Sequence, residues 1–532
     1  MASETYDYII AGGGTAGAVL AGRLTEDAST RVLLLEAGGK DNNPLIHVPA
    51  GFAKLTGSKY DWGYVSVPQR HCLDREIPLA QGRVLGGGGS INAQVFTRGA
   101  REDYDEWAAK FGCTGWAFED VQPYFIKSES NERLSAPWHG TDGPIGVSDL
   151  ANPHPLTKAW VQAGQEYGLP YNGDFNGESQ LGTGYYQTTT KNGRRCSAAV
   201  GYLRPARKRH NLEIKTGVLV SRVMLSSKRA TGVEYVEDGQ RRTARADAEV
   251  IVTSGAYGSP ALLQRSGIGN GDDLRSAGVE VQHELAGVGE NLHDHCDLDL
   301  IYELLEYQSM DRLAKARPGT AAAGLQYLAY RRGPLASTVV EGGAFTHGYA
   351  KESLPDLQFH FLPAAGVEDG VESLRPGYGV TLNSYFLRPH SRGSVKLRSS
   401  DPDILPLVDP NFLASDFDVE ASIEGLKQSH EIMSQPSMAK HVKAETRGFS
   451  KLRKKDDLVR FVRTYGRTSY HPVGSCAMGT LEGSVVGPDL SVHGIAGLRI
   501  ADSSVMPQVI SSNTQMPTVM IAEKAADLIR GR

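Results

Sequence analysis

The sequence predicts a mixed α/β fold built around a parallel sheet, and three observations support this prediction. Residues 6–11 form a short apolar run that is followed at once by the glycine-rich stretch GGGTAG. Residues 31–38, RVLLLEAG, form a second such run. Strand-like runs recur in the middle of the chain, at 211–226 and 248–259. Continuous apolar runs separated by helical segments are typical of buried parallel strands.

Length and composition restrict the size and the class of the protein. A chain of 532 residues exceeds what one hydrophobic core usually organises, so we expect two domains or one domain with large insertions. A net charge of -5 argues against a nucleic-acid surface, which needs a basic excess. A neutral or polar small molecule is the expected ligand. Five scattered cysteines form no C-x-x-C pair, so neither a disulfide framework nor a zinc site is expected.

The N-terminal stretch, MASETYDYII, has neither a positive region nor a long apolar core. No stretch approaches the roughly 18 apolar residues that a spanning helix needs. We therefore expect a cytoplasmic protein without a transmembrane segment. Association with a membrane surface stays open at this stage.

The first glycine-rich stretch fits a dinucleotide-binding turn. Gly12, Gly14 and Gly17 satisfy G-x-G-x-x-G between the first predicted strand and a predicted helix at 16–24. One glycine makes the turn, one lets the backbone approach a pyrophosphate, and one allows close helix packing. Glu36 ends the second strand 19 residues after Gly17, which is close to the spacing of a ribose-binding carboxylate. The choice between NAD and FAD stays open here.

A second glycine-rich segment, residues 82–99, contains four consecutive glycines, Gly86 to Gly89. Glycines remove every side chain where the backbone passes beside something large and flat. Alone, such a segment could be a loop or a lid hinge. Together with the first glycine-rich stretch, it predicts a second wall of one cofactor site.

Four motifs make the chain resemble the glucose-methanol-choline (GMC) oxidoreductases, a family of FAD-dependent enzymes that oxidise alcohols. They are the first glycine-rich stretch, GRVLGGGGSIN at 82–92, GAYGSPALLQRSGIG at 255–269, and a C-terminal pair formed by HPVGSCAMG at 471–479 and the segment 500–529. The resemblance covers the chain from end to end. Within the family, segments such as LIHVPAGFAKL and WHGTDGPIGVSDL look most similar to bacterial FAD-dependent L-sorbose dehydrogenase.

The resemblance implies a Rossmann-like FAD-binding domain of GMC type with an inserted substrate domain built on an antiparallel sheet. The FAD-binding domain would be formed by three segments, 1–155, 196–300 and 465–532. The substrate domain would be formed by two, 156–195 and 301–464. Strand candidates at 355–364 and 377–387 fit that second sheet.

The resemblance also implies the catalytic residues. The family's catalytic histidine falls on His471, and its second catalytic position falls on Asn513, 42 residues later. A histidine suits the removal of a hydroxyl proton near neutral pH, and an amide can donate a hydrogen bond to the developing alkoxide. Pro472 restricts the backbone geometry of His471. Without the family match, a structural histidine would be the better interpretation.

Position by position, the resemblance implies a set of cofactor contacts: Gly12, Gly14, Thr15, Ala16, Gly17, Glu36, Val84, Asn92, Ala93, Val95, Val220, Asp502 and Ser503. A carboxylate near a phosphate is unusual, so Asp502 has the alternative role of capping backbone N–H groups. Some members tether FAD through a histidine in the second glycine-rich segment. Ile91 and Asn92 stand there, which predicts non-covalent FAD.

Two further features receive no functional assignment from the sequence. The stretch NLHDHCD at 291–297 could suggest a metal site, but no clear motif supplies further ligands, and no metal is predicted. Arg194 and Arg195 could bind substrate, although such arginines are more often structural.

The leading functional hypothesis is oxidation of a primary alcohol to an aldehyde, with L-sorbose as the expected substrate. A different primary alcohol, such as an aryl or furfuryl alcohol or choline, is the alternative. A hydroxynitrile lyase and a flavin-bearing binding module are more remote. The electron acceptor, whether oxygen, a quinone or another carrier, stays open.

Overall fold

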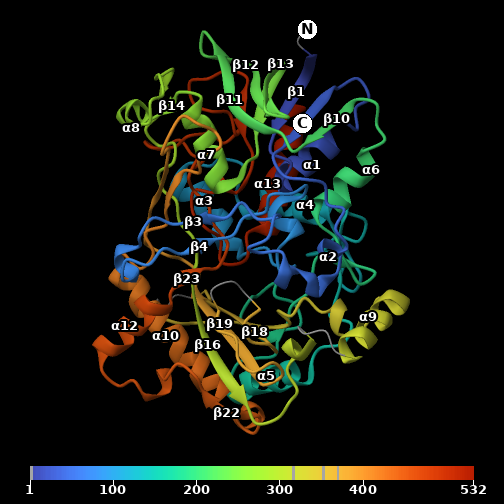
Figure 1. The fold of residues 1–532 in the computed structure, drawn as a ribbon, viewed down its shortest axis with the longest axis vertical. Helices are drawn as coiled ribbons and strands as arrows, with labels where there is room; N and C mark the ends of the chain where they lie inside the picture. Colours follow the sequence, from blue (N-terminus) through green and yellow to red (C-terminus); the bar gives the residue numbers. More distant parts are fainter. Residues whose placement is uncertain (1–3, 314–317, 350–353, 368–370, 532) are drawn as a thin grey trace.

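The computed structural model describes residues 4–313, 318–349, 354–367 and 371–531. It shows a mixed α/β molecule with two large sheets, whose labelled strands lie toward opposite ends of the molecule (Figure 1). Both chain ends lie at the end that holds the first sheet. The α/β prediction is therefore confirmed.

The first sheet has seven strands and is mainly parallel at its centre. Its strands come from three distant parts of the sequence because β1 pairs with β13, and β13 with β24. The strands, in spatial order, are β10 (Leu212–Thr216), β2 (Val32–Glu36), β1 (Glu4–Ala11), β13 (Gln240–Val252), β12 (Arg229–Glu237) and β11 (Leu219–Ser226), with β24 (Leu498–Ile500) beside β13.

The second sheet also has seven strands, and its pairings are antiparallel. The predicted strands at 355–364 and 377–387 are its central members, β18 and β19. The strands, in spatial order, are β22 (Val442–Glu445), β16 (Cys296–Leu304), β19 (Gly379–Phe386), β18 (Leu357–Leu362), β17 (Gly342–Thr346) and β7 (Gly182–Tyr185), with β23 (Arg467–Thr468) beside β16. The expected antiparallel sheet is thus present, while the five-segment division of the chain stays a prediction.

Helices surround both sheets (Figure 1). Helices α1 and α13 pack together beside the first sheet, and α5 and α10 pack near the second. The helices are α1 (Thr15–Leu24), α2 (Pro44–His47), α3 (Arg101–Phe111), α4 (Phe118–Ser128), α5 (Pro155–Glu166), α6 (Arg204–Ala206), α7 (Gly255–Arg265), α8 (Gly271–Ser276), α9 (Pro318–Tyr330), α10 (Asp416–Met433), α11 (Pro436–Ala439), α12 (Lys455–Tyr465) and α13 (Gln515–Ile529).

Short strand pairs connect the larger elements. They are β3 (Tyr64–Val65) with β4 (Pro78–Leu79), β5 (Glu129–Asn131) with β6 (Ile145–Val147), β8 (Thr190–Lys191) with β9 (Arg194–Arg195), β14 (Ile268–Gly269) with β15 (His283–Glu284), and β20 (Ser394–Lys396) with β21 (Leu407–Asp409). Within the described ranges, no helix has the length and apolar character needed to cross a membrane.

The turn between β1 and α1 requires its glycines for steric reasons. Gly12 has a φ of +117°, and a Cβ there would lie 2.5 Å from the carbonyl oxygen of Thr253. A Cβ on Gly17 would overlap the carbonyl oxygen of Gly12. The helix therefore begins close against the end of β1, as the glycine spacing predicts.

Gly17→Ala should destabilise the protein by about 1–3 kcal/mol, because the added methyl group forces α1 away from the turn. Urea unfolding of the apoprotein measures this cost. Gly39→Ala is the matched control, since a Cβ at Gly39 meets no atom within 4 Å. Equal stability of the two variants would contradict the steric argument.

Candidate active site

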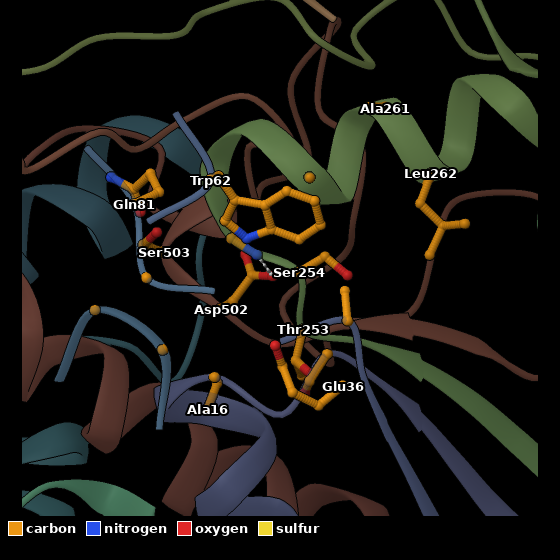
Figure 2. A pocket seen from close by; sticks show the side chains of 18 of the residues that line it. Ala16, Glu36, Trp62, Gln81, Thr253, Ser254, Ala261, Leu262, Asp502 and Ser503 are labelled. Atoms are coloured by element: carbon orange, nitrogen blue, oxygen red, sulfur yellow. Dashed lines mark hydrogen bonds between the residues drawn. The ribbon is translucent and has the colours of Figure 1, made fainter. Parts of the chain in front are cut away.

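A first cavity, with about 1250 Å³ of empty space, lies at the carboxyl ends of the parallel strands. Gly12 follows β1, Glu36 ends β2, Thr253 follows β13, and Asp502 comes shortly after β24 (Figure 2). Because parallel strands place their carboxyl ends at one edge, residues far apart in sequence meet here. This edge is where open α/β sheets bind their ligands.

The Glu36 carboxylate joins two turns at the edge of the first cavity. One oxygen accepts a hydrogen bond from the Gly13 N–H at 2.7 Å, and the other accepts one from the Gly38 N–H at 2.6 Å. Burial raises the pKa of Glu36, and these two bonds lower it. A carboxylate has about four acceptor sites, so capacity remains for two hydroxyl donors such as those of a ribose.

Asp502 caps backbone groups. One of its oxygens accepts from the Gly255 N–H at 2.8 Å and from the Ser259 hydroxyl at 2.6 Å. The other accepts from the Ser504 N–H at 2.8 Å. These bonds match the alternative role that the sequence leaves open for this carboxylate, and they hold the start of α7 against the segment after β24.

The two glycine-rich segments pack against each other, because the Gly86 N–H donates to the Gly13 carbonyl at 2.8 Å, and both border the first cavity. The first turn of α1 has no side-chain cap, so the N–H groups near Thr15 and Ala16 are available to an anion in the first cavity. A Cβ added at Gly88 would meet no atom within 4 Å, because Gly88 borders open space in both cavities. A flat, bulky group with a diphosphate fits such walls.

A second cavity, with about 1020 Å³ of empty space, adjoins the first. The two cavities share six lining residues, Gln81, Gly82, Gly88, Tyr470, Thr514 and Gln515. Both predicted catalytic residues, His471 and Asn513, line the second cavity. One extended ligand could therefore pass from the strand ends of the first cavity to these two side chains.

A hydrogen-bond chain sets the tautomer of His471. The His295 Nε2–H donates to the Leu387 carbonyl at 3.0 Å, so the Nδ1 atom of His295 must accept. The Nδ1–H of His471 donates to that atom at 3.1 Å. The Nε2 atom of His471 is consequently the unprotonated nitrogen.

Asn513 is oriented by the bonds that its side-chain oxygen accepts. The Thr97 hydroxyl donates to Oδ1 at 3.0 Å, and the Gln358 amide donates to the same atom at 3.1 Å. The Nδ2 group of Asn513 therefore faces His471, and donates to its Nε2 at 2.9 Å. The second N–H of the Asn513 amide is left for a ligand oxygen.

The histidines of this site are held neutral. Burial, reinforced by the nearby His295 and His360, holds the pKa of His471 well below its usual value. Burial also lowers the pKa of His295 to about 4 and that of His360 to about 3. At neutral pH, His471 is therefore an uncharged base.

The segment that presents His471 is fixed by Asp294. This carboxyl accepts from the His471 N–H at 2.9 Å and from the Thr468 hydroxyl at 2.5 Å. Burial raises the pKa of Asp294 to about 7, against these hydrogen bonds, which lower it. Tyr470, directly before the histidine, has a φ of +64°. The loop thus holds a strained residue that its hydrogen bonds keep in place.

Most predicted cofactor residues line the cavities. Eight border the first cavity: Gly12, Gly14, Thr15, Ala16, Glu36, Val220, Asp502 and Ser503. Three border the second: Asn92, Ala93 and Val95. Gly17 and Val84 line neither cavity; Gly17 packs against Gly12, and Val84 is buried in a small cluster with Ile46 and Leu55.

Sequence reasoning missed the side chains that orient the pair. Asp294 and His295 belong to the stretch NLHDHCD, and both serve to place His471. In the same stretch, His293 accepts from the Val509 N–H at 2.9 Å. Gln358 and His360, two residues apart in the otherwise apolar strand β18, share one face. Two polar residues on one face of an apolar strand are a sequence signal that could have marked Gln358 and His360 as site residues.

Arg195 has a structural role, because it holds the second glycine-rich segment through Asn92. It is buried, and it donates to the Ile46 carbonyl at 2.7 Å and to Asn92 Oδ1 at 2.6 Å. Asn92 Oδ1 also accepts from the Gln94 N–H at 3.1 Å. Because Asn92 Oδ1 faces these two donors, the amide N–H groups of Asn92 point away from them. Asn92 also lines the second cavity.

Comparison with known families agrees with this geometry. The GMC oxidoreductase N-terminal model matches residues 6–297, and the C-terminal model matches residues 389–522. The chain belongs to the GMC oxidoreductase family. It is therefore an oxidoreductase that acts on alcohols, and FAD is the cofactor of its family.

Named relatives of this GMC oxidoreductase cover nearly its whole length. It is 41% identical over 528 residues to an alcohol dehydrogenase [acceptor] of Pseudomonas putida, covering 98% of this chain and 95% of the relative. It is also 41% identical over 537 residues to an oxygen-dependent choline dehydrogenase of Paraburkholderia xenovorans (strain LB400), covering 100% and 95%. A structure of Aspergillus oryzae RIB40 formate oxidase, determined to study its FAD modification, has a TM-score of 0.93 at 27% identity, covering 100% and 99%.

The residues present fit FAD. The uncapped start of α1 suits its diphosphate, Glu36 suits a ribose, and the open space beside Gly88 suits the flat ring system. In this GMC oxidoreductase the glycine-rich walls and the His471–Asn513 pair therefore belong to one continuous site.

His295→Leu should lower kcat by about 100-fold while FAD content is kept, because His471 loses the acceptor that fixes its ring. His295→Asn is the matched control, since the Asn Oδ1 can take the place of the ring Nδ1 as acceptor. It should recover much of the lost activity. Steady-state kinetics of the two variants measures this, and equal losses would contradict the orienting role of His295.

Proposed function

We propose that this GMC oxidoreductase oxidises an uncharged primary alcohol to an aldehyde. The observation that carries this proposal is the Nε2 atom of His471, an uncharged acceptor fixed in one tautomer on the wall of the second cavity. A group that removes a hydroxyl proton needs an acceptor lone pair, and Nε2 supplies one at a defined place. In the structure this lone pair accepts from the Asn513 amide, a donor that the alcohol hydroxyl would replace.

The chemistry divides between the cofactor and the chain. FAD, when bound, supplies the acceptor for the hydride that leaves the alcohol carbon. His471 takes the hydroxyl proton at Nε2, and the second N–H of Asn513 stabilises the charge that develops on the alcohol oxygen. The hydrogen bond from His471 Nδ1 to His295 keeps the ring in place as its charge changes.

The second cavity favours an uncharged substrate. Among its described lining residues, Asp297 is the one carboxylate. The Arg467 guanidinium lies 2.6 Å from its Oδ2, so this negative charge is balanced by an ion pair. A quaternary ammonium group needs an unbalanced carboxylate or an aromatic cage. Apolar side chains, including Phe52, Ile91 and Val340, form much of the remaining wall.

L-sorbose, the substrate expected from the sequence, fits this cavity less well than a simpler alcohol. Each hydroxyl of a sugar needs a polar partner when it leaves water. The relatives reported above are named for an alcohol and for choline, and none of them for sorbose. Choline is the second candidate because of that relative, and the neutral cavity argues against it.

We further propose that FAD is held non-covalently. Neither Ile91 nor Asn92, the positions at which a tethering histidine would stand, has a nucleophilic side chain. Asn92 instead offers amide N–H groups on the wall of the second cavity. Denaturation followed by filtration should release all of the flavin, and flavin that stays with the chain would contradict this proposal.

Anaerobic addition of a medium-chain primary alcohol should bleach the flavin absorbance of the holoenzyme, whereas choline at the same concentration should not. Stopped-flow absorbance measures both. Rapid bleaching by choline alone would show that the second cavity binds a cation after all. An unchanged spectrum with every alcohol would overturn the redox function. A hydroxynitrile lyase and a flavin-bearing binding module would then be the remaining hypotheses.

His471→Ala should keep FAD and lose alcohol oxidation by at least about 100-fold, because the variant lacks the imidazole that takes the hydroxyl proton. His210→Ala, at an exposed histidine outside both cavities, is the control and should retain full activity. Near-normal turnover of His471→Ala would remove His471 from the mechanism.

A further inference from the structure

Helix α9 presents an apolar surface to solvent. Leu325, Leu328 and Tyr330 are 69%, 67% and 74% exposed. The helix, PGTAAAGLQYLAY, contains no charged residue. Helices on the surface of soluble proteins normally have polar or charged residues on the outward face. The exposed leucines of α9 therefore suggest a partner.

The opposite face of α9 is anchored to the protein. Ala323 and Tyr327, four residues apart, are buried, while Leu325 and Leu328 lie around the helix from them. The Tyr327 hydroxyl donates to the Gly193 carbonyl at 3.0 Å. Figure 1 shows α9 at the periphery of the molecule. The apolar face is therefore held outward by a fixed inner face.

The surroundings of α9 are basic. Three neighbouring segments, 44–58, 189–195 and 318–338, contain no Asp or Glu, although the chain as a whole has a net charge of -5. They are connected through Tyr327, which contacts the carbonyls of His47 and Gly193. Their exposed or half-buried basic residues are Lys54, Lys191, Arg194, Arg331 and Arg332. This combination of an apolar stripe and basic residues is called the α9 surface below.

We propose that the α9 surface docks on an anionic lipid bilayer. Leu325, Leu328 and Tyr330 would enter the boundary between headgroups and acyl chains, and the basic residues would contact the anionic headgroups. A helix of 13 residues is too short to span a membrane, which needs about 20, but has the length of an interfacial helix. The local positive charge on an acidic protein favours lipid headgroups over a second copy of the chain.

Docking would also bring the second cavity close to the lipid. Phe52 and Val340 line that cavity, and they pack in one hydrophobic cluster. Phe52 belongs to the segment 44–58 of the α9 surface, and Val340 follows the segment 318–338. This consequence rests on the proposed function, because an apolar alcohol concentrates in the bilayer; the docking itself does not depend on it.

Flotation of the holoenzyme with vesicles of phosphatidylglycerol and phosphatidylcholine in equal amounts tests the proposal. We expect binding at low salt, and little binding to vesicles of phosphatidylcholine alone. Leu325→Ser with Leu328→Ser should weaken binding by at least about tenfold, because two leucines no longer enter the lipid. Arg331→Glu with Arg332→Glu should weaken it by about tenfold or more.

Leu481→Ser is the matched control, since Leu481 is a 53% exposed leucine outside the α9 surface. All variants should keep wild-type activity with a soluble dye in the absence of vesicles, which shows that they fold and bind FAD. Unchanged vesicle binding by the double leucine variant would overturn the proposal. A wild-type dimer that this variant dissociates in sedimentation velocity would also overturn it, in favour of a second copy of the chain.

Discussion

The site depends on one chain of hydrogen bonds between uncharged groups, from the Leu387 carbonyl through His295 to His471. Its direction is set at the backbone end, because a carbonyl can only accept. The donor or acceptor role of each later ring nitrogen follows from this. The Nε2 lone pair of His471, which accepts from the Asn513 amide, is thereby placed at the cavity wall without a charged partner. Burial keeps the imidazoles neutral, which is the state that a general base needs.

The two sheets contribute different parts of that site. The parallel sheet supplies an edge where the chain turns at the ends of β1, β2, β13 and β24, and its glycine-rich turn and Glu36 suit a dinucleotide. The antiparallel sheet supplies β16 and β18. Asp297 in β16 lines the second cavity, His295 directly before β16 contacts His471, and Gln358 in β18 contacts Asn513. The second glycine-rich segment borders both cavities. His471 and Asn513 therefore lie on the wall of a cavity that shares this segment with the first cavity.

Charge balance distinguishes the second cavity from its surroundings. Asp297 and Asp299 project from β16 and pair with Arg467 and Arg447, so buried negative charges are matched by buried positive ones. A cavity lined in this way gives no net attraction to a cation and leaves apolar contacts to select the substrate. Outside the site, the basic residues near α9 have no neighbouring carboxylate in their own segments, and the electrostatics there favour an anionic partner.

The sequence by itself determined the α/β class, the strand–glycine turn–helix unit, the antiparallel second sheet and the family. The α/β class and the turn rest on local spacing, because Gly12, Gly14 and Gly17 fix a turn whatever follows. The second sheet and the family came from the resemblance of four motifs to known GMC oxidoreductases. The positions of His471 and Asn513 came from the family motif. Only the tertiary structure decided that Asp294 and His295 orient His471, that Asp502 caps backbone groups, and that Asp297 is neutralised by Arg467. Each of these depends on contacts between residues far apart in the chain, because hydrogen bonds and ion pairs are set by distance in space, which local sequence spacing does not encode.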